Sequence, residues 1–177
     1  QMTDEEVAHL LGGQPNTGVA NTFGWGNMPE YGIPNCMTAD GPAGLRIAPE
    51  CGVTTTAWPC ATLLAATWNP NVVYQVGAAG GKEVKENNIA AWLTPALNIH
   101  RSPLCGRNFE YYSEDPLLAG VLAGAMVKGI QSQGVAATVK HFALNNKETD
   151  RKHSDSRVSE RAARETVSYT HLTLPTT

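Results

Sequence analysis

Short apolar runs alternate with helix-length segments along this chain, and this alternation constrains its fold more than any other feature. The runs 36–39, 90–99 and 135–139 have the composition of buried strands, and a proline interrupts the second of them. Helical periodicity fills the intervals 70–87 and 116–134. Because these intervals are too long for hairpins, the pattern predicts parallel strands joined by crossover helices, which is an α/β fold.

Capping signals mark where several helices begin. Thr3 and Glu6 form a capping box ahead of a short N-terminal helix. Asp115 is an N-cap followed by a proline at the first helical position, and a further helix is expected to begin at Ser159. The segment that runs to about Pro34 is rich in Gly, Asn and Pro, so it is expected to be a loop.

Composition and charge exclude several classes of function. With a net charge of -3 and no run of Lys or Arg, the 177-residue chain has no basic surface for nucleic acid. Its four cysteines form no C-x-x-C pair, so we expect no metal centre, and free thiols in a reducing cytoplasm. No cofactor is expected either. No apolar run reaches the length of a membrane span and no signal peptide is visible, although the chain begins at Gln1 and not at Met.

Charged and imidazole side chains follow the predicted strands, at the points where ligands bind in parallel sheets and barrels. Fixed cations with one carboxylate are suited to hold a small hydroxyl-rich or anionic ligand, because each can form a charge-assisted hydrogen bond. We expect these side chains to converge on one pocket. The candidate ligand-binding residues are Asp40, Arg46, Arg107, Lys140, His141 and Arg151.

Four sequence motifs carry a resemblance to a known family. They are DGPAGLR at 40–46, WPCATLLAATWN at 58–69, PALNIHRSPLCGRNFE at 95–110 and KHFALNN at 140–146, which Arg151 follows. In order and spacing they are similar to glycoside hydrolase family 3. The resemblance runs from about residue 2 to residue 165, which is nearly the whole chain.

The resemblance implies a partial (β/α)8 TIM-like barrel, roughly its first half, over residues 1–166. The complete family architecture adds the remainder of the barrel and a partner α/β sandwich domain. Residues 167–177 are Thr-rich and end in LPTT, so they are interpreted as a non-native tail. The activity implied is retaining hydrolysis of β-linked sugars at the non-reducing end, with a β-glucoside or an oligosaccharide as substrate.

The same resemblance assigns roles to the candidate residues. Asp40 resembles the family carboxylate that accepts hydrogen bonds from sugar hydroxyls, and the other five candidates match donors around the same ring. Retaining hydrolysis also needs a nucleophile and an acid/base, two carboxyl groups about 5–5.5 Å apart. The chain has no Ser-Asp-Trp-like motif, so the nucleophilic Asp and the acid/base Glu are expected outside it, and the chain alone is expected to be inactive.

Other conspicuous residues are interpreted as structural. Glu110 is expected to order the loop that carries Arg107, and Asp115 to cap the helix that follows it. His100 and His153 are expected to hold loops. Among the aromatic residues, we expect three in the core and one as a candidate for stacking against a sugar: Trp58, Trp68 and Trp92 for the core, and Trp25 for the sugar.

Alternatives stay open within and outside the family. The KHFALNN motif favours the glucosidase branch, with a β-xylosidase as the second activity. A non-catalytic carbohydrate-binding barrel could be built from the same residues. A phosphate-handling barrel enzyme is the third possibility, because the cations that suit a sugar also suit a phosphate group.

Overall fold

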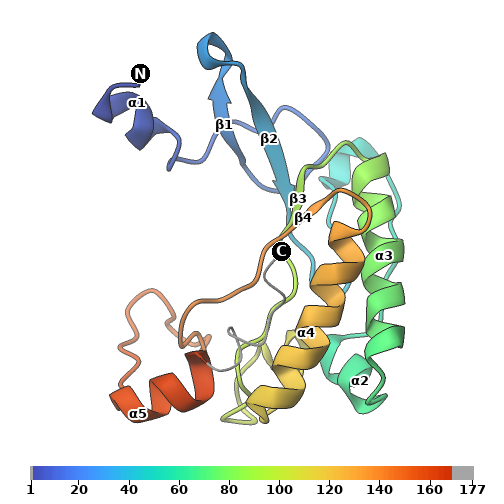
Figure 1. Cartoon of the computed structure of the whole chain (residues 1–177), viewed down its shortest axis with the longest axis vertical. Helices are drawn as coiled ribbons and strands as arrows, with labels where there is room; N and C mark the ends of the chain where they lie inside the picture. The colour runs from blue at the N-terminus through green and yellow to red at the C-terminus, as the bar shows by residue number, and fades with distance from the viewer. Residues whose placement is uncertain (1, 169–177) are drawn as a thin grey trace.

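The computed structural model describes residues 2–168, drawn in Figure 1. The elements follow one another in the order α1 (Asp4–His9), β1 (Gly24–Met28), η1 (Pro29–Tyr31), β2 (Ile33–Ala39), η2 (Pro49–Cys51), α2 (Ala61–Ala66), α3 (Pro70–Glu86), β3 (Ala91–Trp92), η3 (Asn108–Glu110), α4 (Pro116–Gln131), β4 (Ala136–Ala137), α5 (Glu160–Ala162) and the π-helical η4 (Ala163–Ser168).

Three of the four strands, β2, β3 and β4, are parallel, as the alternation of the sequence predicts. The strand order is β1-β2-β3-β4, with Thr38 paired to Ala91 and Ala91 paired to Ala136. Helices α3 and α4 make the two crossovers between these strands and lie side by side (Figure 1). The predicted α/β class is therefore confirmed. Because the three strands are parallel, their carboxyl ends lie at the same edge of the sheet.

One expectation about the sheet is wrong. Residues Gly24–Met28 were predicted to belong to a loop, but they form β1, which pairs antiparallel with β2 as a hairpin. The connection is the short 3-10 turn η1, closed by Gly32 in the left-handed conformation. The sequence of β1 contains two glycines and an asparagine, which are rare in strands and typical of turns, so the sequence does not predict a strand here.

The predicted strands at 90–99 and 135–139 are real but form only short ladders. Each ladder is two residues long, in β3 and β4. Beyond Pro95 the two chains pair again, through the parallel bridge between Ala96 and Lys140 and the 2.8 Å bond from the Leu97 N–H to the Lys140 carbonyl. Since proline has no N–H to donate, an interruption at this point is expected. This second pairing places residues 96–98 beside residues 140–141, which belong to the site described below.

The core lies between the sheet and the paired helices. Trp92 is 1% exposed and is held by a 3.1 Å hydrogen bond from its Nε1 to the carbonyl of Gly41. The helices approach closely at Gly129, where an added Cβ would lie 2.3 Å from the carbonyl oxygen of Tyr74. Such contact needs glycine at this position. The close-packed helix pair thereby covers one face of the sheet and holds its strands in place.

Several local expectations have clear outcomes. The capping box of Thr3 and Glu6 and the N-cap of Asp115 are both formed. The helix predicted from Ser159 does begin there, but only three of its residues are α-helical before the π-helical segment. Helix α2 was not predicted.

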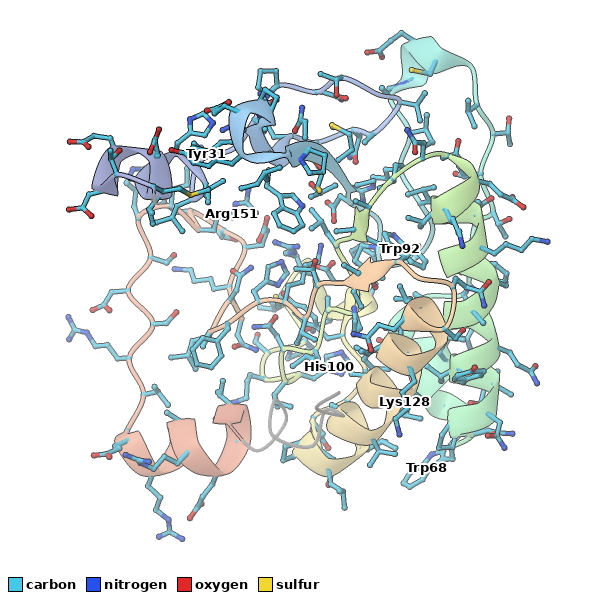
Figure 2. The ribbon with its side chains drawn as sticks, turned by 45° about the horizontal axis from the view of Figure 1, so that its top comes forward. Tyr31, Trp68, Trp92, His100, Lys128 and Arg151 are labelled. Carbon is cyan, nitrogen blue, oxygen red and sulfur yellow. The ribbon has the colours of Figure 1, made fainter. Side chains whose placement is uncertain are left out.

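The tryptophan predictions have mixed outcomes. Trp92 is in the core and Trp58 packs against it partly buried, but the prediction for Trp68 is wrong because it is 75% exposed. Trp68 lies in the turn between α2 and α3, with a positive φ of 52°, and its ring points outward at the end of the helix pair (Figure 2). Trp25, the stacking candidate, lies half-exposed in β1.

Two further expectations concern the chain as a whole. The suggested tail from residue 167 lies outside the described residues, except for Val167 and Ser168. No helix between residues 2 and 168 is both long and apolar enough to cross a membrane. All four cysteines are free.

Candidate functional site: a linked cluster at the strand ends

Asp40 and Lys140 meet across the sheet. Asp40 directly follows β2, and Lys140 comes three residues after β4, so strand pairing brings together side chains that are 100 positions apart. The Lys140 ammonium donates to the Asp40 carboxylate at 2.6 Å. The Asp40 side chain keeps 27% of its surface exposed, and Lys140 keeps 13%. This geometry leaves the carboxylate accessible to a ligand.

Charge controls the protonation of Asp40. Burial alone would raise the pKa of its carboxyl group, but the hydrogen bond and the charge of Lys140 outweigh it, and Arg46 adds to their effect. The net result is a lowered pKa, so Asp40 is an anionic acceptor at neutral pH. Arg46 is the weaker partner, because its Nη1 lies 3.4 Å from the carboxylate and its side chain is 57% exposed.

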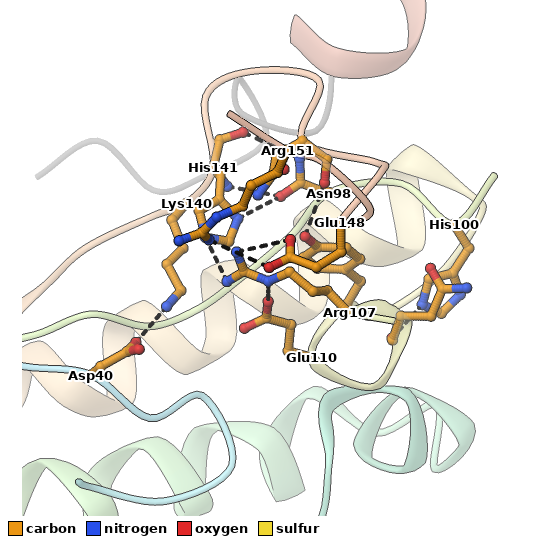
Figure 3. Close-up of polar contacts among 12 residues, drawn as sticks. Asp40, Asn98, His100, Arg107, Glu110, Lys140, His141, Glu148 and Arg151 are labelled. Carbon is orange, nitrogen blue, oxygen red and sulfur yellow. Dashed lines mark hydrogen bonds and ion pairs between the residues drawn. The ribbon is translucent and has the colours of Figure 1, made fainter. Parts of the chain in front are cut away.

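Arg107 occupies the middle of a second group of polar side chains, which includes Glu110 and His141 (Figure 3). It stands at the N-cap of η3, and its Nε donates to Glu110, which is only 3% exposed. Its Nη2 lies 2.9 Å from Nε2 of His141. The expectation that Glu110 orders the loop of Arg107 fits this contact. The guanidinium is thereby fixed in orientation.

His141 is held from the other side by Asn98. The Asn98 Oδ1 lies 2.9 Å from the backbone nitrogen of His141 and 3.0 Å from its Nδ1. Burial lowers the pKa of His141 to about 4, and the cations Arg107 and Lys140 act in the same direction. The imidazole is therefore neutral at physiological pH.

Glu148 joins Arg151 to this group. Its carboxylate lies 3.7 Å from Arg107 Nη1 and 3.5 Å from Arg151 Nη1. Arg151 is 52% exposed, so it is the outermost cation of the group. Glu148 accordingly bridges two cations that come from different loops (Figure 3).

The structure thus links all six predicted residues. Asp40 contacts Lys140 and Arg46, Lys140 is bonded in sequence to His141, and the chain of contacts continues through Arg107. Glu148 then completes the link to the last predicted residue, Arg151.

His100, His153 and Asp115 make the local contacts expected of structural residues. His100 Nε2 lies 2.8 Å from the Asn108 carbonyl oxygen, and exposed His153 lies 2.8 Å from Asp150. The Asp115 side chain accepts from the Leu118 N–H at 2.7 Å.

Two residues of the cluster were missed by sequence reasoning. Asn98 lies at the carboxyl end of the predicted strand 90–99, so the same strand-end rule that selected Asp40 would have found it. Glu148 lies three positions before Arg151, the spacing at which opposite charges pair within one turn. Neither residue is a cation, so neither belongs to the pattern of fixed cations that predicts ligand donors.

A cavity of about 250 Å³ opens beside the cluster. It is lined by Asn98 and His141, and also by Arg101 and Asn146. Of the six predicted residues only His141 lines it, so the Asp40–Lys140 pair lies outside this cavity. Among residues 2–168, no group of three His, Cys, Asp or Glu side chains is arranged to hold a metal ion.

Comparison with known proteins identifies the family. Residues 27–170 match the model of the glycosyl hydrolase family 3 N terminal domain. Beta-glucosidase A of Butyrivibrio fibrisolvens is 71% identical over 165 residues, which cover 93% of this chain and 20% of that protein. The crystal structure of a beta-glucosidase from Paenibacillus barengoltzii superposes with a TM-score of 0.91 at 42% identity, over 98% of this chain and 19% of that one.

A structure with a bound sugar is also similar. Beta-glucosidase 3B from Thermotoga neapolitana, in complex with α-D-glucose, superposes with a TM-score of 0.83 at 45% identity, over 93% of this chain and 25% of that one. The chain therefore spans about a fifth to a quarter of the length of these relatives. Its fold corresponds to part of their TIM barrel, as predicted. The chain belongs to the glycosyl hydrolase family 3 N-terminal domain family.

Proposed function

We propose that this chain forms part of the sugar-binding half of a retaining β-glucosidase, with the nucleophilic Asp and the acid/base Glu supplied from outside the chain. The remainder of the barrel and an α/β sandwich domain are the implied partners. Activity then belongs to the complete protein. The family match and the names of the relatives support this proposal.

The observation that carries the proposal is the Asp40–Lys140 pair. A pyranose presents neighbouring hydroxyls, each of which can donate to a carboxylate and accept from a cation. A partly exposed carboxylate 2.6 Å from an ammonium offers both functions at one point. Arg46, Arg107, His141 and Arg151 would surround the other positions of the same ring.

The test uses the complete reading frame that contains this chain. Hydrolysis of a p-nitrophenyl β-glucoside is measured for the parent and for Asp40→Asn, which keeps the size of the side chain but removes its charge. Losing one charge-assisted hydrogen bond, worth about 1.5–3 kcal/mol, should reduce kcat/KM by at least roughly ten- to a hundredfold. Exposed Glu160→Gln is the control and should leave kcat/KM unchanged. Equal activity of Asp40→Asn and the parent would contradict the proposal.

Hydrolysis of two substrates, together with glucose binding and the thermal shift caused by each ligand, separates the alternatives. A higher kcat/KM for the β-xyloside than for the β-glucoside would favour a β-xylosidase. Glucose binding without hydrolysis of either substrate would indicate a non-catalytic carbohydrate-binding protein. If phosphate raises Tm and glucose does not, the cations serve a phosphate group.

The location in the cell is a separate proposal. The four free cysteines support a reducing compartment, and we propose the cytoplasm. The redox state of the thiols, trapped at cell lysis, would test this directly.

A further inference from the structure

Asn98 holds His141 through three contacts, and these contacts determine where the imidazole proton lies. The Asn98 Oδ1 is 2.9 Å from the backbone nitrogen of His141 and 3.0 Å from Nδ1, while Asn98 Nδ2 is 3.3 Å from the His141 carbonyl oxygen. A backbone N–H can only donate and a carbonyl can only accept. The two backbone groups therefore fix the orientation of the Asn98 amide, with its oxygen toward the ring.

The orientation of the amide then sets the tautomer. Because Oδ1 can only accept, the nitrogen that faces it, Nδ1, must carry the hydrogen. In a neutral imidazole this leaves Nε2 with a lone pair. Arg107 gives an independent check, since its Nη2 lies 2.9 Å from Nε2 and a guanidinium can only donate. Both sides of the ring require the same tautomer.

We propose that Asn98 is a positioning residue that keeps His141 in the neutral Nδ1–H form, so that the imidazole accepts from Arg107 and directs its guanidinium toward the sugar. This rests on the proposed function and deepens it. His141 then acts on the substrate through Arg107, in contrast to the direct donor role that the family resemblance implies.

The surroundings of His141 support a neutral ring. Asn98 is 6% exposed, so the amide has no competing water on most of its surface. The charges of Arg107, Lys140 and Arg151 disfavour a proton on the imidazole, and the charge of Asp40 favours one. The Tyr111 ring lies nearly perpendicular to the imidazole, with the two ring centres 6.3 Å apart, and is not a charged partner. Burial and the three cations lower the pKa of His141 to about 4.

Two substitutions in the complete protein separate orientation from charge. Asn98→Leu removes the acceptor, so Nδ1–H is no longer selected and the Nε2–H form would face the donors of Arg107. Asn98→Asp keeps an acceptor at the same place but adds a negative charge, which favours protonation of His141. Asn71→Asp, an exposed asparagine in the first turn of α3, introduces the same charge away from the site and is the matched control.

The readout is the inhibition constant of glucose between pH 5 and pH 8. For Asn98→Leu we expect glucose binding to weaken about tenfold at every pH, the effect of losing one hydrogen bond to a charged group. For Asn98→Asp we expect binding close to the parent at pH 8 and a progressive loss toward pH 5, because a protonated Nε2 repels Arg107. The control should follow the parent. A substitution that only disturbs folding would lower Tm without changing the pH profile.

A second measurement reads the tautomer directly. In protein labelled with carbon-13 at histidine, the Cδ2 chemical shift distinguishes Nδ1–H from Nε2–H, and His141→Gln identifies the signal of His141. An Nδ1–H signal that is lost in Asn98→Leu supports the inference. An Nε2–H signal in the parent, or a parental pH profile in Asn98→Asp, overturns it. Absence of any glucose binding by the parent would instead refute the proposed function, and the labelled protein would still report the tautomer.

Discussion

The cluster has an Asp40 side, with Lys140 and Arg46, and an Arg107 side, with Glu110 and His141. The two sides differ in how much of their side-chain surface a ligand can reach. On the Asp40 side, the Asp40 side chain is 27% exposed and pairs with two cations, Lys140 and Arg46. The Arg46 side chain is 57% exposed. On the other side, Arg107 is 17% exposed and Glu110 is 3% exposed. The Asp40 side retains an accessible acceptor and an accessible donor, whereas the Arg107–Glu110 pair on the other side is largely enclosed by the protein.

This difference indicates that the two sides have different roles, one in rigidity and one in ligand contact. A side chain that is already held by neighbours loses little conformational entropy when a ligand arrives, which favours precise binding. The partly exposed Asp40 and the exposed Arg46 leave an acceptor and a donor that a ligand can reach. The Arg107 side is thus the rigid frame, and the Asp40 side is the contact surface. Mutations on the Arg107 side should therefore affect mainly stability, and mutations on the Asp40 side mainly ligand affinity.

The largest stability effect is expected at Glu110. Replacing it with Gln removes the buried charge that pairs with Arg107, and breaking one partner of a buried ion pair costs about 3–5 kcal/mol. We expect the lower end, about 3 kcal/mol, because Glu148 still faces the guanidinium. The measurement is guanidinium chloride unfolding of the complete protein.

An exposed ion pair provides the control for Glu110. Glu160 pairs with Arg164 on the surface, so Glu160→Gln should change the free energy of unfolding by no more than about 0.5 kcal/mol. If both substitutions have equally small effects, the Arg107 side is not the rigid frame.

His141 should make stability depend on pH. Its pKa is about 4 in the folded protein and about 6.5 when unfolded, so between these values the unfolded state binds a proton that the folded state does not. Stability is therefore full above about pH 6.5 and falls as the pH drops toward 4. His141→Gln cannot titrate, so it should lose about 1 kcal/mol less than the parent between pH 7 and pH 5, after allowance for solvent screening.

The control for His141 is an exposed histidine. His153 lies on the surface, 78% exposed, and His153→Gln should show the same loss between pH 7 and pH 5 as the parent. Unfolding midpoints at the two pH values give the comparison. A parental pH dependence in His141→Gln would mean that the ring is not held as a buried neutral group.

The sequence predicts the contact surface better than the frame. Asp40 and Lys140 were found because each follows an apolar run, and the parallel order of the runs follows from the helices between them. Asn98 also ends a predicted apolar run, but the run does not show that its amide faces His141, and the role of Glu148 depends on which loops meet in space. The β1–β2 hairpin was hidden for a related reason: its glycines and asparagine are tolerated by pairing with β2, which is a tertiary contact.

The smallest effect is expected at Arg46, and it sharpens the comparison within the contact surface. Arg46 and Lys140 both face Asp40, at 3.4 Å and 2.6 Å, but only Arg46 is largely exposed. Exposed ion pairs contribute about 0–1 kcal/mol, so Arg46→Gln should change the free energy of unfolding by less than about 0.5 kcal/mol. Lys140→Met should cost more, because it leaves the half-buried Asp40 carboxylate without its close partner. Equal effects of the two substitutions would show that distance and burial do not distinguish the two cations, and that Asp40 is held by their summed charge.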